Sequence, residues 1–333
     1  MIAVIGATGY IGRYLCPYLK SKGYDVLALG RSPKAASFLS EHNVRFEYFD
    51  IDSSDSFRTL DKYEISAIVY LSACLAEIET PVEDFFKVNT IGVYKMLDYA
   101  HRRDIRRFVM TSSHKVYNDV NKQFISETDE ISFRGDHSPY IISKIAAENF
   151  MTYYEKDFGI CGITLRLTGV RGYGEILGHL DKDGTYRKSA LELFFESALE
   201  GREICVWGDS SVVRDHVYIK DVIRAISCAL EASGNVSGIF NIASGIGHSQ
   251  YDEAQAMVKV FGDGDLSKIV CCREKPGLAR AYVYDISKAE RLLGWKPLYS
   301  DLVEMYSDYK TEWISKEYKN YHFFIPGQAP LTQ

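Results

Sequence analysis

The sequence has no cysteine spacing of the kind that binds zinc or forms a redox-active pair. Its seven cysteines include no Cys-x-x-Cys pair and no Cys/His cluster with ligand spacing, so we expect no metal site. They are odd in number and lie mostly inside apolar runs, which predicts reduced core thiols in a reducing compartment. They are Cys16, Cys74, Cys161, Cys205, Cys228, Cys271 and Cys272.

The sequence also lacks any apolar run close to the roughly 20 residues that a membrane-spanning helix needs. Met1 leads directly into a strand-like run, which leaves no room for a signal peptide. The net charge of −6 argues against nucleic acid or an anionic membrane as a partner. We therefore expect a cytoplasmic protein that binds neither nucleic acid nor a membrane.

What is present is an alternation of strand-like and helical segments, without internal repeats. Apolar, β-branched runs occur at 2–5, 24–29, 44–49, 66–71, 106–111 and 161–167. Helical periodicity separates them, most clearly at 81–102 and 139–158. This alternation predicts an α/β fold with a Rossmann-like, doubly wound parallel sheet.

The pattern loosens after Leu167, which predicts a second, smaller lobe. A glycine-rich stretch that begins at Gly169 is too long for an ordinary connection and indicates a functional loop. Further on, we expect helices at 188–199 and 219–231 and strands at 203–207 and 238–243. The predicted division is a dinucleotide-binding domain of residues 1–167 plus 216–243 and a C-terminal α+β substrate lobe of residues 168–215 plus 244–333.

Three glycines follow the first predicted strand and open the first predicted helix. Gly6 permits a tight strand-to-helix turn, Gly9 lets the backbone approach a pyrophosphate, and Gly12 lets the helix pack closely on the sheet. The helix N-terminus then offers free N–H groups and the positive end of the helix dipole to the phosphates. This arrangement predicts a dinucleotide site at the start of the chain.

Tyr140 and Lys144 stand four residues apart within the predicted helix 139–158. Residues at this spacing share one face of a helix, so a phenol and an ammonium are expected to lie side by side. A nearby cation favours the phenolate, and we expect Lys144 to lower the pKa of Tyr140 towards the range where acid–base catalysis works. A second feature is the hydroxyl cluster Thr111-Ser112-Ser113, which ends a predicted strand and should face the cofactor.

Together these segments resemble the extended short-chain dehydrogenase/reductase superfamily, in its nucleotide-sugar-modifying NAD-dependent epimerase/dehydratase branch. The resemblance runs over nearly the whole chain and includes Arg214-Asp215-His216-Val217-Tyr218 as a C-terminal signature. It implies that Tyr140 exchanges a proton with the substrate as hydride moves to or from the nicotinamide. It further implies that Lys144 binds the nicotinamide ribose and that Ser113 hydrogen-bonds the reacting oxygen.

The resemblance also implies the binding residues, with Asp50-Ile51 at the adenine and Arg214 on the nucleotide diphosphate. The implied cofactor contacts are Gly6, Thr8, Gly9, Tyr10, Ile11, Gly12, Arg31, Ser32, Asp50, Ile51, Leu71, Ser72, Ala73, Asn89, Thr111, Tyr140, Lys144, Leu167 and Val170. The implied substrate contacts are Ser113, His114, Tyr140, Gly169, Arg214 and Lys275.

The end of the second predicted strand bears on the choice between NAD and NADP. Enzymes that use NAD place an acidic residue there, whereas an arginine accommodates the extra phosphate of NADP. This chain has Gly30 at the acidic position, followed by Arg31 and Ser32. A guanidinium binds phosphate in a bidentate manner, so NADP is favoured over NAD, which stays open as the alternative.

The residues that follow Ser113 help to distinguish the reactions that members of this branch catalyse. The 4,6-dehydratases carry an Asp-Glu pair after the hydroxyl residue, and here His114 and Lys115 stand in its place, so that reaction is disfavoured. His114 is either a second acid–base group or a polar residue of the pocket. The resemblance therefore implies a sugar-nucleotide epimerase or a 4-ketoreductase.

Two substrate positions depart from the family pattern. The family usually has an asparagine on the diphosphate where this chain reads Leu167-Thr168-Gly169, and an acidic residue on the ribose where it has Leu278. A reductase of a non-nucleotide carbohydrate, or of another carbonyl compound, thus stays open. So does a non-catalytic NADP sensor or scaffold on the same fold. The resemblance finally implies a homodimer formed through the helices near 84–101 and 140–157.

Overall fold

The computed structural model describes residues 1–75, 80–132, 137–175, 178–180 and 185–315. The chain forms two compact units, which we describe separately. The first unit comprises Met1–Thr168, Ile219–Ala243 and Asp285–Lys296. The second comprises Gly169–Tyr218, Ser244–Tyr284 and the described residues from Pro297 onward.

The first unit is built on a seven-stranded sheet in which every neighbouring pair is parallel. In spatial order its strands are β13 (Gly238–Ile242), β7 (Cys161–Leu167), β5 (Arg107–Ser113), β4 (Ala67–Tyr70), β1 (Ile2–Ile5), β2 (Val26–Gly30) and β3 (Arg45–Tyr48). The predicted α/β fold with a Rossmann-like parallel sheet is confirmed.

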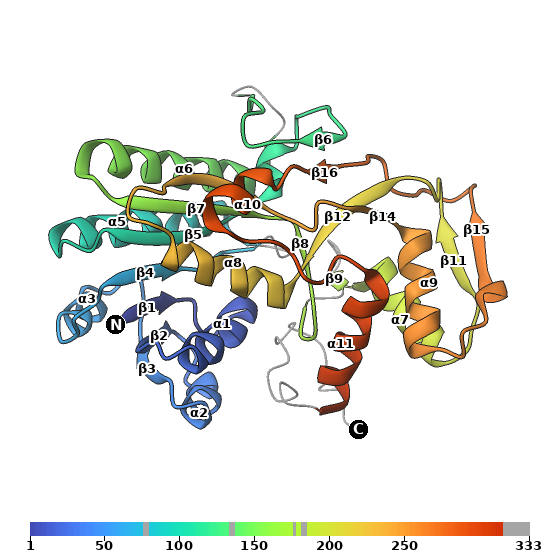
Figure 1. Cartoon of the computed structure of the whole chain (residues 1–333), viewed down its shortest axis with the longest axis horizontal. Helices are drawn as coiled ribbons and strands as arrows, with labels where there is room; N and C mark the ends of the chain where they lie inside the picture. The colour runs from blue at the N-terminus through green and yellow to red at the C-terminus, as the bar shows by residue number, and fades with distance from the viewer. Residues whose placement is uncertain (76–79, 133–136, 176–177, 181–184, 316–333) are drawn as a thin grey trace. The chain divides into compact units, whose positions relative to one another are not determined.

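Helices cover both faces of this sheet, as expected of parallel strands joined by crossovers. Figure 1 shows α5 and α6 on one face and α1 and α8 on the other. The helical segments of this unit are α1 (Tyr10–Ser21), α2 (Lys34–Glu41), α3 (Ser54–Leu60), α4 (Val82–Phe85), the π-helical η1 (Phe86–Ile91), α5 (Gly92–Arg102), the 3₁₀ turn η2 (His114–Tyr117), α6 (Pro139–Phe158), α8 (Ile219–Glu231) and α10 (Ser287–Leu293). The short strand β6 (Phe124–Ile125) also belongs to it. The apolar strand residues form a core from which water is fully excluded, for example at Val4, Leu27, Ile68, Phe108 and Ile163.

The helix that carries the Tyr/Lys pair begins and ends at residues suited to those positions. The Ser138 side chain accepts from the Ile141 N–H, and Pro139 occupies the first turn, where its missing N–H costs nothing. Gly159 ends the helix with φ of 67°, a conformation that glycine adopts freely. These signals explain why the predicted bounds of 139–158 agree with the structure.

In its described residues, the second unit combines small sheets with three α-helices. Its three-stranded sheet has the order β14 (Gly247–Ser249), β12 (Val213–Tyr218), β8 (Gly169–Arg171). Two further pairs are β9 (Gly178–Leu180) with β10 (Tyr186–Lys188), and β11 (Ile204–Trp207) with β15 (Ile269–Cys272). The other segments are α7 (Ala190–Leu199), α9 (Gln250–Phe261), the 3₁₀ turn η3 (Leu266–Lys268), the strand β16 (Val283–Tyr284) and α11 (Leu302–Ser315).

One segment near the C-terminus belongs to a different unit from the one that we expected. The predicted division placed 244–333 wholly in the second lobe, whereas Asp285–Lys296 packs with the first unit. It also placed 216–218 in the first domain, whereas these last residues of β12 belong to the second unit. The reason is Trp295, whose side chain is fully buried and whose indole N–H donates to the Asp221 carbonyl of α8 at 3.0 Å. The periodicity of a short helix does not reveal which core it covers.

The prediction that all seven cysteines are reduced is wrong for one pair. Cys205 of β11 and Cys272 of β15 form a disulfide, with their Cα atoms 6.0 Å apart. The two strands are parallel neighbours, so residues 67 positions apart meet across the pair. Elsewhere, Cys16 is fully buried in α1, and burial raises the pKa of its thiol.

The described residues contain neither a helix suited to a membrane nor a cluster of metal ligands. No helix among them is long and apolar enough to cross a membrane. No group of three or more His, Cys, Asp or Glu side chains within the same residues is arranged to hold a metal ion.

Candidate active site

The glycine loop after β1 has no room for side chains. Gly6 has φ of 85°, and a Cβ there would lie 2.7 Å from the Ser72 nitrogen. A Cβ on Gly12 would lie 2.5 Å from the Ala7 Cα, so α1 packs directly against the loop. Gly9 forms the N-cap of α1 without a side chain that would cover the helix end. The loop thus leaves the first N–H groups of α1 available to an anion, and it fits the pyrophosphate of a dinucleotide.

The end of β2 explains why position 30 is glycine. A Cβ on Gly30 would lie 2.7 Å from the Thr8 Cγ2 atom of the glycine loop. Arg31 and Ser32 follow directly and are exposed. A larger residue at position 30 would displace Thr8, and the polar side chains next in line are free to reach a ligand.

The segment after β3 carries the pair Asp50-Ile51, whose backbone is held by side chains. The Asp50 N–H donates to the Ser56 hydroxyl at 3.0 Å, and the Lys95 ammonium donates to the Ile51 carbonyl at 3.1 Å. Lys95 and Lys87 also flank Asp52, and their hydrogen bonds hold the pKa of Asp52 below its usual range although partial burial opposes them.

Asn89 ties the segment after β4 to α6. Its amide oxygen accepts from the Cys74 N–H at 2.7 Å, and its amide nitrogen donates to the Cys74 carbonyl at 3.1 Å and to the Ser143 hydroxyl at 3.0 Å. Ser143 in turn donates to the Tyr140 carbonyl at 2.7 Å. Asn89 therefore braces the protein, and it holds both the Leu71-Ser72-Ala73 segment and the start of α6.

The structure brings Ser113, Tyr140 and Lys144 together at the carboxyl end of β5. The hydroxyls of Ser113 and Tyr140 are hydrogen bonded, and the Lys144 ammonium donates to the Thr111 carbonyl at 3.1 Å. The Ser113 hydroxyl also accepts from the Lys115 N–H at 3.2 Å, which fixes the turn at His114. Ser113 and Lys144 are buried, and Tyr140 is half-buried.

The expected effect of Lys144 on Tyr140 is not what the structure shows. Burial raises the pKa of Tyr140 above its usual range, and the hydrogen bond from Ser113 is what lowers it in part. The ammonium is 6.0 Å from the centre of the Tyr140 ring and donates to the backbone instead. Burial also lowers the pKa of Lys144 to about 8, while the charge of Glu148 opposes this shift. A phenol in this setting is protonated at neutral pH and is ready to donate.

The remaining predicted residues are spread over both units. Leu167 ends β7 in the first unit, whereas Gly169 and Val170 belong to β8 and Arg214 to β12 in the second. Lys275 is exposed and lies 4.9 Å above the Trp207 ring. The aromatic contact gives Lys275 a structural partner.

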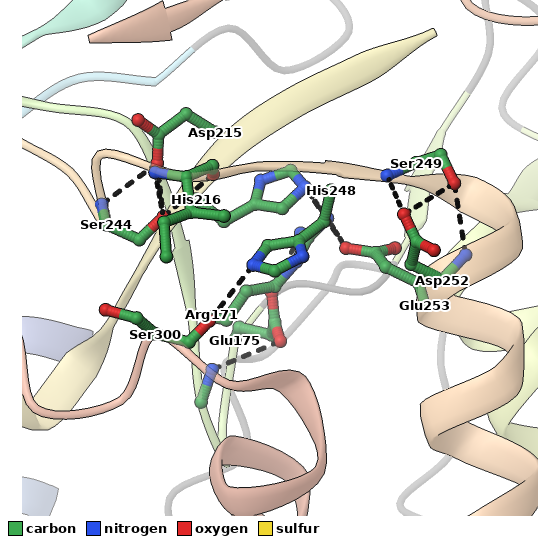
Figure 2. Close-up of polar contacts among 12 residues, drawn as sticks. Arg171, Glu175, Asp215, His216, Ser244, His248, Ser249, Asp252, Glu253 and Ser300 are labelled. Carbon is green, nitrogen blue, oxygen red and sulfur yellow. Dashed lines mark hydrogen bonds and ion pairs between the residues drawn. The ribbon is translucent and has the colours of Figure 1, made fainter. Parts of the chain in front are cut away.

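A cavity of about 230 Å³ lies in the second unit, around Arg214. It is lined by Arg171, Glu175, Ser189, Ala190, Leu191, Arg214, His216, His248, Gln250, Glu253 and Leu278. Figure 2 shows part of this set, in which Arg171 lies close to Glu175 and Glu253 and the His216 ring points toward Glu253. Strands β8, β12 and β14 and helix α9 thus place cations and carboxylates around one hollow.

The carboxylates of this cavity have very different pKa values. Arg171 and His216 lower the pKa of Glu253 to about 2 against the effect of burial. Burial dominates at Glu175 and raises its pKa to about 7, although Arg171 opposes it. The pKa of His216 is lowered by burial and by Arg171. At neutral pH the cavity therefore holds two guanidinium ions against one full and one partial negative charge.

Sequence reasoning found Arg214 but missed most of its neighbours in the cavity. Arg214 and His216 stand two residues apart on β12, a spacing that places both on one face of a strand and that gives a usable signal. Arg171, Glu175 and Glu253 come from β8, from the turn after it and from α9. No local pattern indicates that these residues meet.

Asp215, between Arg214 and His216, has a structural role. Its carboxylate is fully buried and accepts hydrogen bonds from the Ser244 hydroxyl at 2.7 Å and from the N–H groups of Ser244, Gly245 and Tyr284. Burial raises its pKa to about 6 even with these donors present. The residue anchors β12 to its neighbouring segments.

Comparison with known sequences adds a family assignment to this geometry. A sequence model described as the NAD dependent epimerase/dehydratase family matches residues 2–243. UDP-glucose 4-epimerase from Lacticaseibacillus casei is 28% identical over 90% of this chain and 93% of the relative. dTDP-glucose 4,6-dehydratase from Salmonella typhimurium is 24% identical over 89% of this chain and 88% of the relative.

Solved structures give the same picture of the fold. UDP-N-acetylglucosamine 4-epimerase from Bacillus cereus superposes with a TM-score of 0.76 at 24% identity, covering 93% of this chain and 98% of that one. UDP-glucuronic acid 4-epimerase from the same organism, solved in complex with NAD, has a TM-score of 0.70 at 25% identity with the same coverage.

Proposed function

Since this chain belongs to the NAD dependent epimerase/dehydratase family, we propose that it is an enzyme that epimerises a nucleotide sugar through a transient keto intermediate. The observation that carries this proposal is the meeting of Ser113, Tyr140 and Lys144 at the end of β5. The relatives and structural neighbours named as UDP-sugar 4-epimerases support it.

The chemistry divides between the cofactor and three side chains. A nicotinamide dinucleotide, held by the glycine loop Gly6–Gly12 and by Lys144, would supply the exchange of hydride with the sugar carbon. The phenol of Tyr140 gives a proton to the ketone oxygen as the ketone is reduced, and in the reverse half-reaction its deprotonated form takes the proton of the reacting hydroxyl. Ser113, whose hydroxyl interacts with Tyr140, is placed to donate a hydrogen bond to the same oxygen when the substrate is bound. Lys144, held at the Thr111 carbonyl, binds the ribose next to the nicotinamide.

We further propose that the cofactor is NADP in preference to NAD. Support comes from Gly30, which supplies no acidic side chain, and from the exposed Arg31 and Ser32 after it. The family name and the NAD complex of one neighbour establish the nicotinamide dinucleotide class without deciding this point. Direct titration of the protein with NAD and with NADP tests the preference.

The cavity of the second unit is proposed to bind the nucleotide part of the substrate. Arg214 lines it and supplies a planar, permanently charged fork for a diphosphate. The segment Leu167-Thr168-Gly169 has no asparagine where the family pattern has one, and Leu278 stands where it has an acidic residue, so we expect a nucleotide contact different from that of the 4-epimerases.

Net reduction of a 4-keto sugar is the second candidate. Two observations favour it: Arg31, because NADP usually serves net reduction, and Tyr140, whose raised pKa keeps it a proton donor. A 4,6-dehydratase reaction has less support, since His114 and Lys115 replace the carboxylates that eliminate water. An epimerase retains its cofactor through purification and consumes none, whereas a reductase consumes NADPH in proportion to product.

A homodimer and a cytoplasmic location belong to the same proposal. Helices α5 and α6 expose several apolar or aromatic side chains, a feature typical of a subunit interface. These side chains are Tyr94, Ile142, Tyr153 and Phe158, which are 39–48% exposed. Light scattering coupled to size-exclusion chromatography tests the dimer.

The function itself is tested by screening nucleotide sugars by mass spectrometry, with and without NADPH. We expect an isomer or a reduced product from one of them, and no turnover by Tyr140→Phe while the affinity for the cofactor stays within about twofold of wild type. Unchanged turnover by this variant rules out the assigned role of Tyr140.

A further inference from the structure

The last three residues of β5 contact three successive turns of α6. Ser113 is hydrogen bonded to Tyr140, the Thr111 carbonyl accepts from Lys144, and the Ser112 hydroxyl donates to the Glu148 carboxylate at 2.6 Å. Tyr140, Lys144 and Glu148 follow each other at intervals of four residues and therefore lie along one face of the helix. Glu148 is thus the third residue on the face of α6 that carries Tyr140 and Lys144.

Glu148 also connects this face of α6 to β7. The Arg166 guanidinium donates to both Glu148 oxygens, at 3.0 Å from Nε and at 2.6 Å from the terminal nitrogen. Arg166 is the residue of β7 that pairs in register with Ser112 of β5. Glu148 consequently sits over two adjacent strands and binds a directly opposed pair of side chains.

The three groups are nearly inaccessible to solvent. Glu148, Arg166 and Ser112 are 5%, 4% and 5% exposed. The Arg166 guanidinium also lies 4.6 Å from the centre of the Tyr117 ring, whose hydroxyl donates to Asn241 of β13 at 2.8 Å. Charged hydrogen bonds buried to this degree are strong and directional, so small displacements of α6 along β5 are resisted.

From this geometry we propose that Glu148 is a positioning residue of the active site, which holds Lys144 and Ser113 in line through Ser112 and Arg166. The inference rests on the proposed function for its meaning in catalysis. Glu148 is one helical turn from Lys144, and its negative charge favours the ammonium form of that side chain. It touches neither Tyr140 nor the Ser113 hydroxyl, so it acts through its neighbours.

The test begins with the titration of Lys144, which requires neither substrate nor turnover. Lysine labelled with carbon-13 next to the amine is followed by NMR from pH 6 to 11, and the Lys144 signal is assigned with Lys144→Arg. In wild type this signal should titrate near the pKa of about 8 that burial imposes on Lys144. In Glu148→Gln we expect it to titrate about 1 pH unit lower, because the compensating charge is gone.

A second variant guards against misfolding, since Glu148→Gln leaves Arg166 buried without its carboxylate. Glu148→Gln combined with Arg166→Met removes both partners of the ion pair, so the protein should remain folded. Lys144 should still titrate at a lower pH than in wild type. The matched control is Thr152→Ala, which removes a hydroxyl that donates to the Glu148 carbonyl from one turn further along α6.

Turnover provides an independent readout of position. Ser112→Ala keeps both charges and loses only the link to β5, so we expect kcat to fall about 10-fold, with KM and the Lys144 titration unchanged. A Lys144 titration at the wild-type pH in both Glu148 variants, or wild-type kcat in Ser112→Ala, overturns the inference. A protein that turns over no nucleotide sugar contradicts the proposed function instead, and the titration still decides the effect of Glu148 on Lys144.

Discussion

Gly30 faces Thr8 so closely that a Cβ at position 30 would lie 2.7 Å from the Thr8 Cγ2 atom. The acidic residue that NAD enzymes use at the end of the second strand thus has no space here unless Thr8 moves. We therefore expect selectivity for the cofactor and packing of the glycine loop to be linked through this contact.

Comparison of Gly30→Asp with Gly30→Ala separates these two effects. Both variants crowd Thr8 and should lose about 1–3 kcal/mol of stability. Only the aspartate repels a 2′-phosphate and accepts from a 2′-hydroxyl, so we expect the ratio of NADP to NAD affinity to fall about 10-fold further in Gly30→Asp. Dissociation constants for both cofactors provide the measurement, and equal ratios in the two variants would show that position 30 does not select the cofactor.

Replacing Arg214 should weaken binding of the nucleotide. The side chain lines the cavity of the second unit, its Nε donates to the Arg280 carbonyl at 3.3 Å, and its guanidinium lies 5.4 Å from the centre of the Tyr282 ring. These contacts hold the guanidinium in place, so Arg214→Met should reduce the affinity for a nucleoside diphosphate about 100-fold by calorimetry.

The matched control is Arg273→Met, at an exposed arginine of the same unit, and its affinity should stay within about twofold of wild type. Arg214→Lys should restore only part of the affinity, because an ammonium cannot replace a bidentate fork. If Arg214→Met and Arg273→Met bind a nucleoside diphosphate with equal affinity, Arg214 does not contact the diphosphate.

Glu175 should make stability depend on pH. Its pKa is raised from 4.5 to about 7 by burial, so the folded protein retains a proton that the unfolded chain releases. Glu175 makes its full contribution to the free energy of unfolding below about pH 4.5, and this contribution is lost as pH rises through 7. The loss amounts to up to about 3 kcal/mol. As pH rises from 5 to 8, the free energy of unfolding of Glu175→Gln should therefore fall less than that of wild type.

Denaturant unfolding at several pH values measures this difference. Asp215 has a raised pKa as well, so its contribution falls with rising pH in both proteins and cancels in the comparison. Parallel curves for wild type and Glu175→Gln would show that Glu175 ionises normally in the folded protein.

Removal of Asn89 should destabilise the first unit. Its amide makes three buried or half-buried hydrogen bonds to Cys74 and Ser143, so Asn89→Ala leaves a backbone N–H and a carbonyl without their partner. We expect a loss of about 3 kcal/mol in the free energy of unfolding. Asn235→Ala, at an exposed position after α8, should change it by less than about 0.5 kcal/mol.

The parts of the fold that could be predicted from the sequence are those that depend on residues close together in the chain. Ser138, Pro139 and Gly159 mark the two ends of α6, and Gly6 and Gly12 mark the loop before α1. Burial and spacing act within a few residues there, so pattern and structure agree.

What the sequence did not reveal depends on contacts between distant segments. The disulfide between Cys205 and Cys272 requires the register of β11 with β15, and the cavity around Arg171 and Glu253 requires β8 to lie beside α9. The pKa of Tyr140 was misjudged for a related reason. Helical spacing places Lys144 nearby, but only the fold shows that its ammonium turns to the Thr111 carbonyl and that burial dominates.

The return of Asp285–Lys296 to the first unit bears on how the protein is made. During synthesis on the ribosome, the parallel sheet and α8 emerge long before Trp295, whose indole fills a fully enclosed position against Asp221. Until that segment is available, the position that the Trp295 side chain fills against α8 stays empty. The first unit can therefore complete its core only after residue 295 has been synthesised.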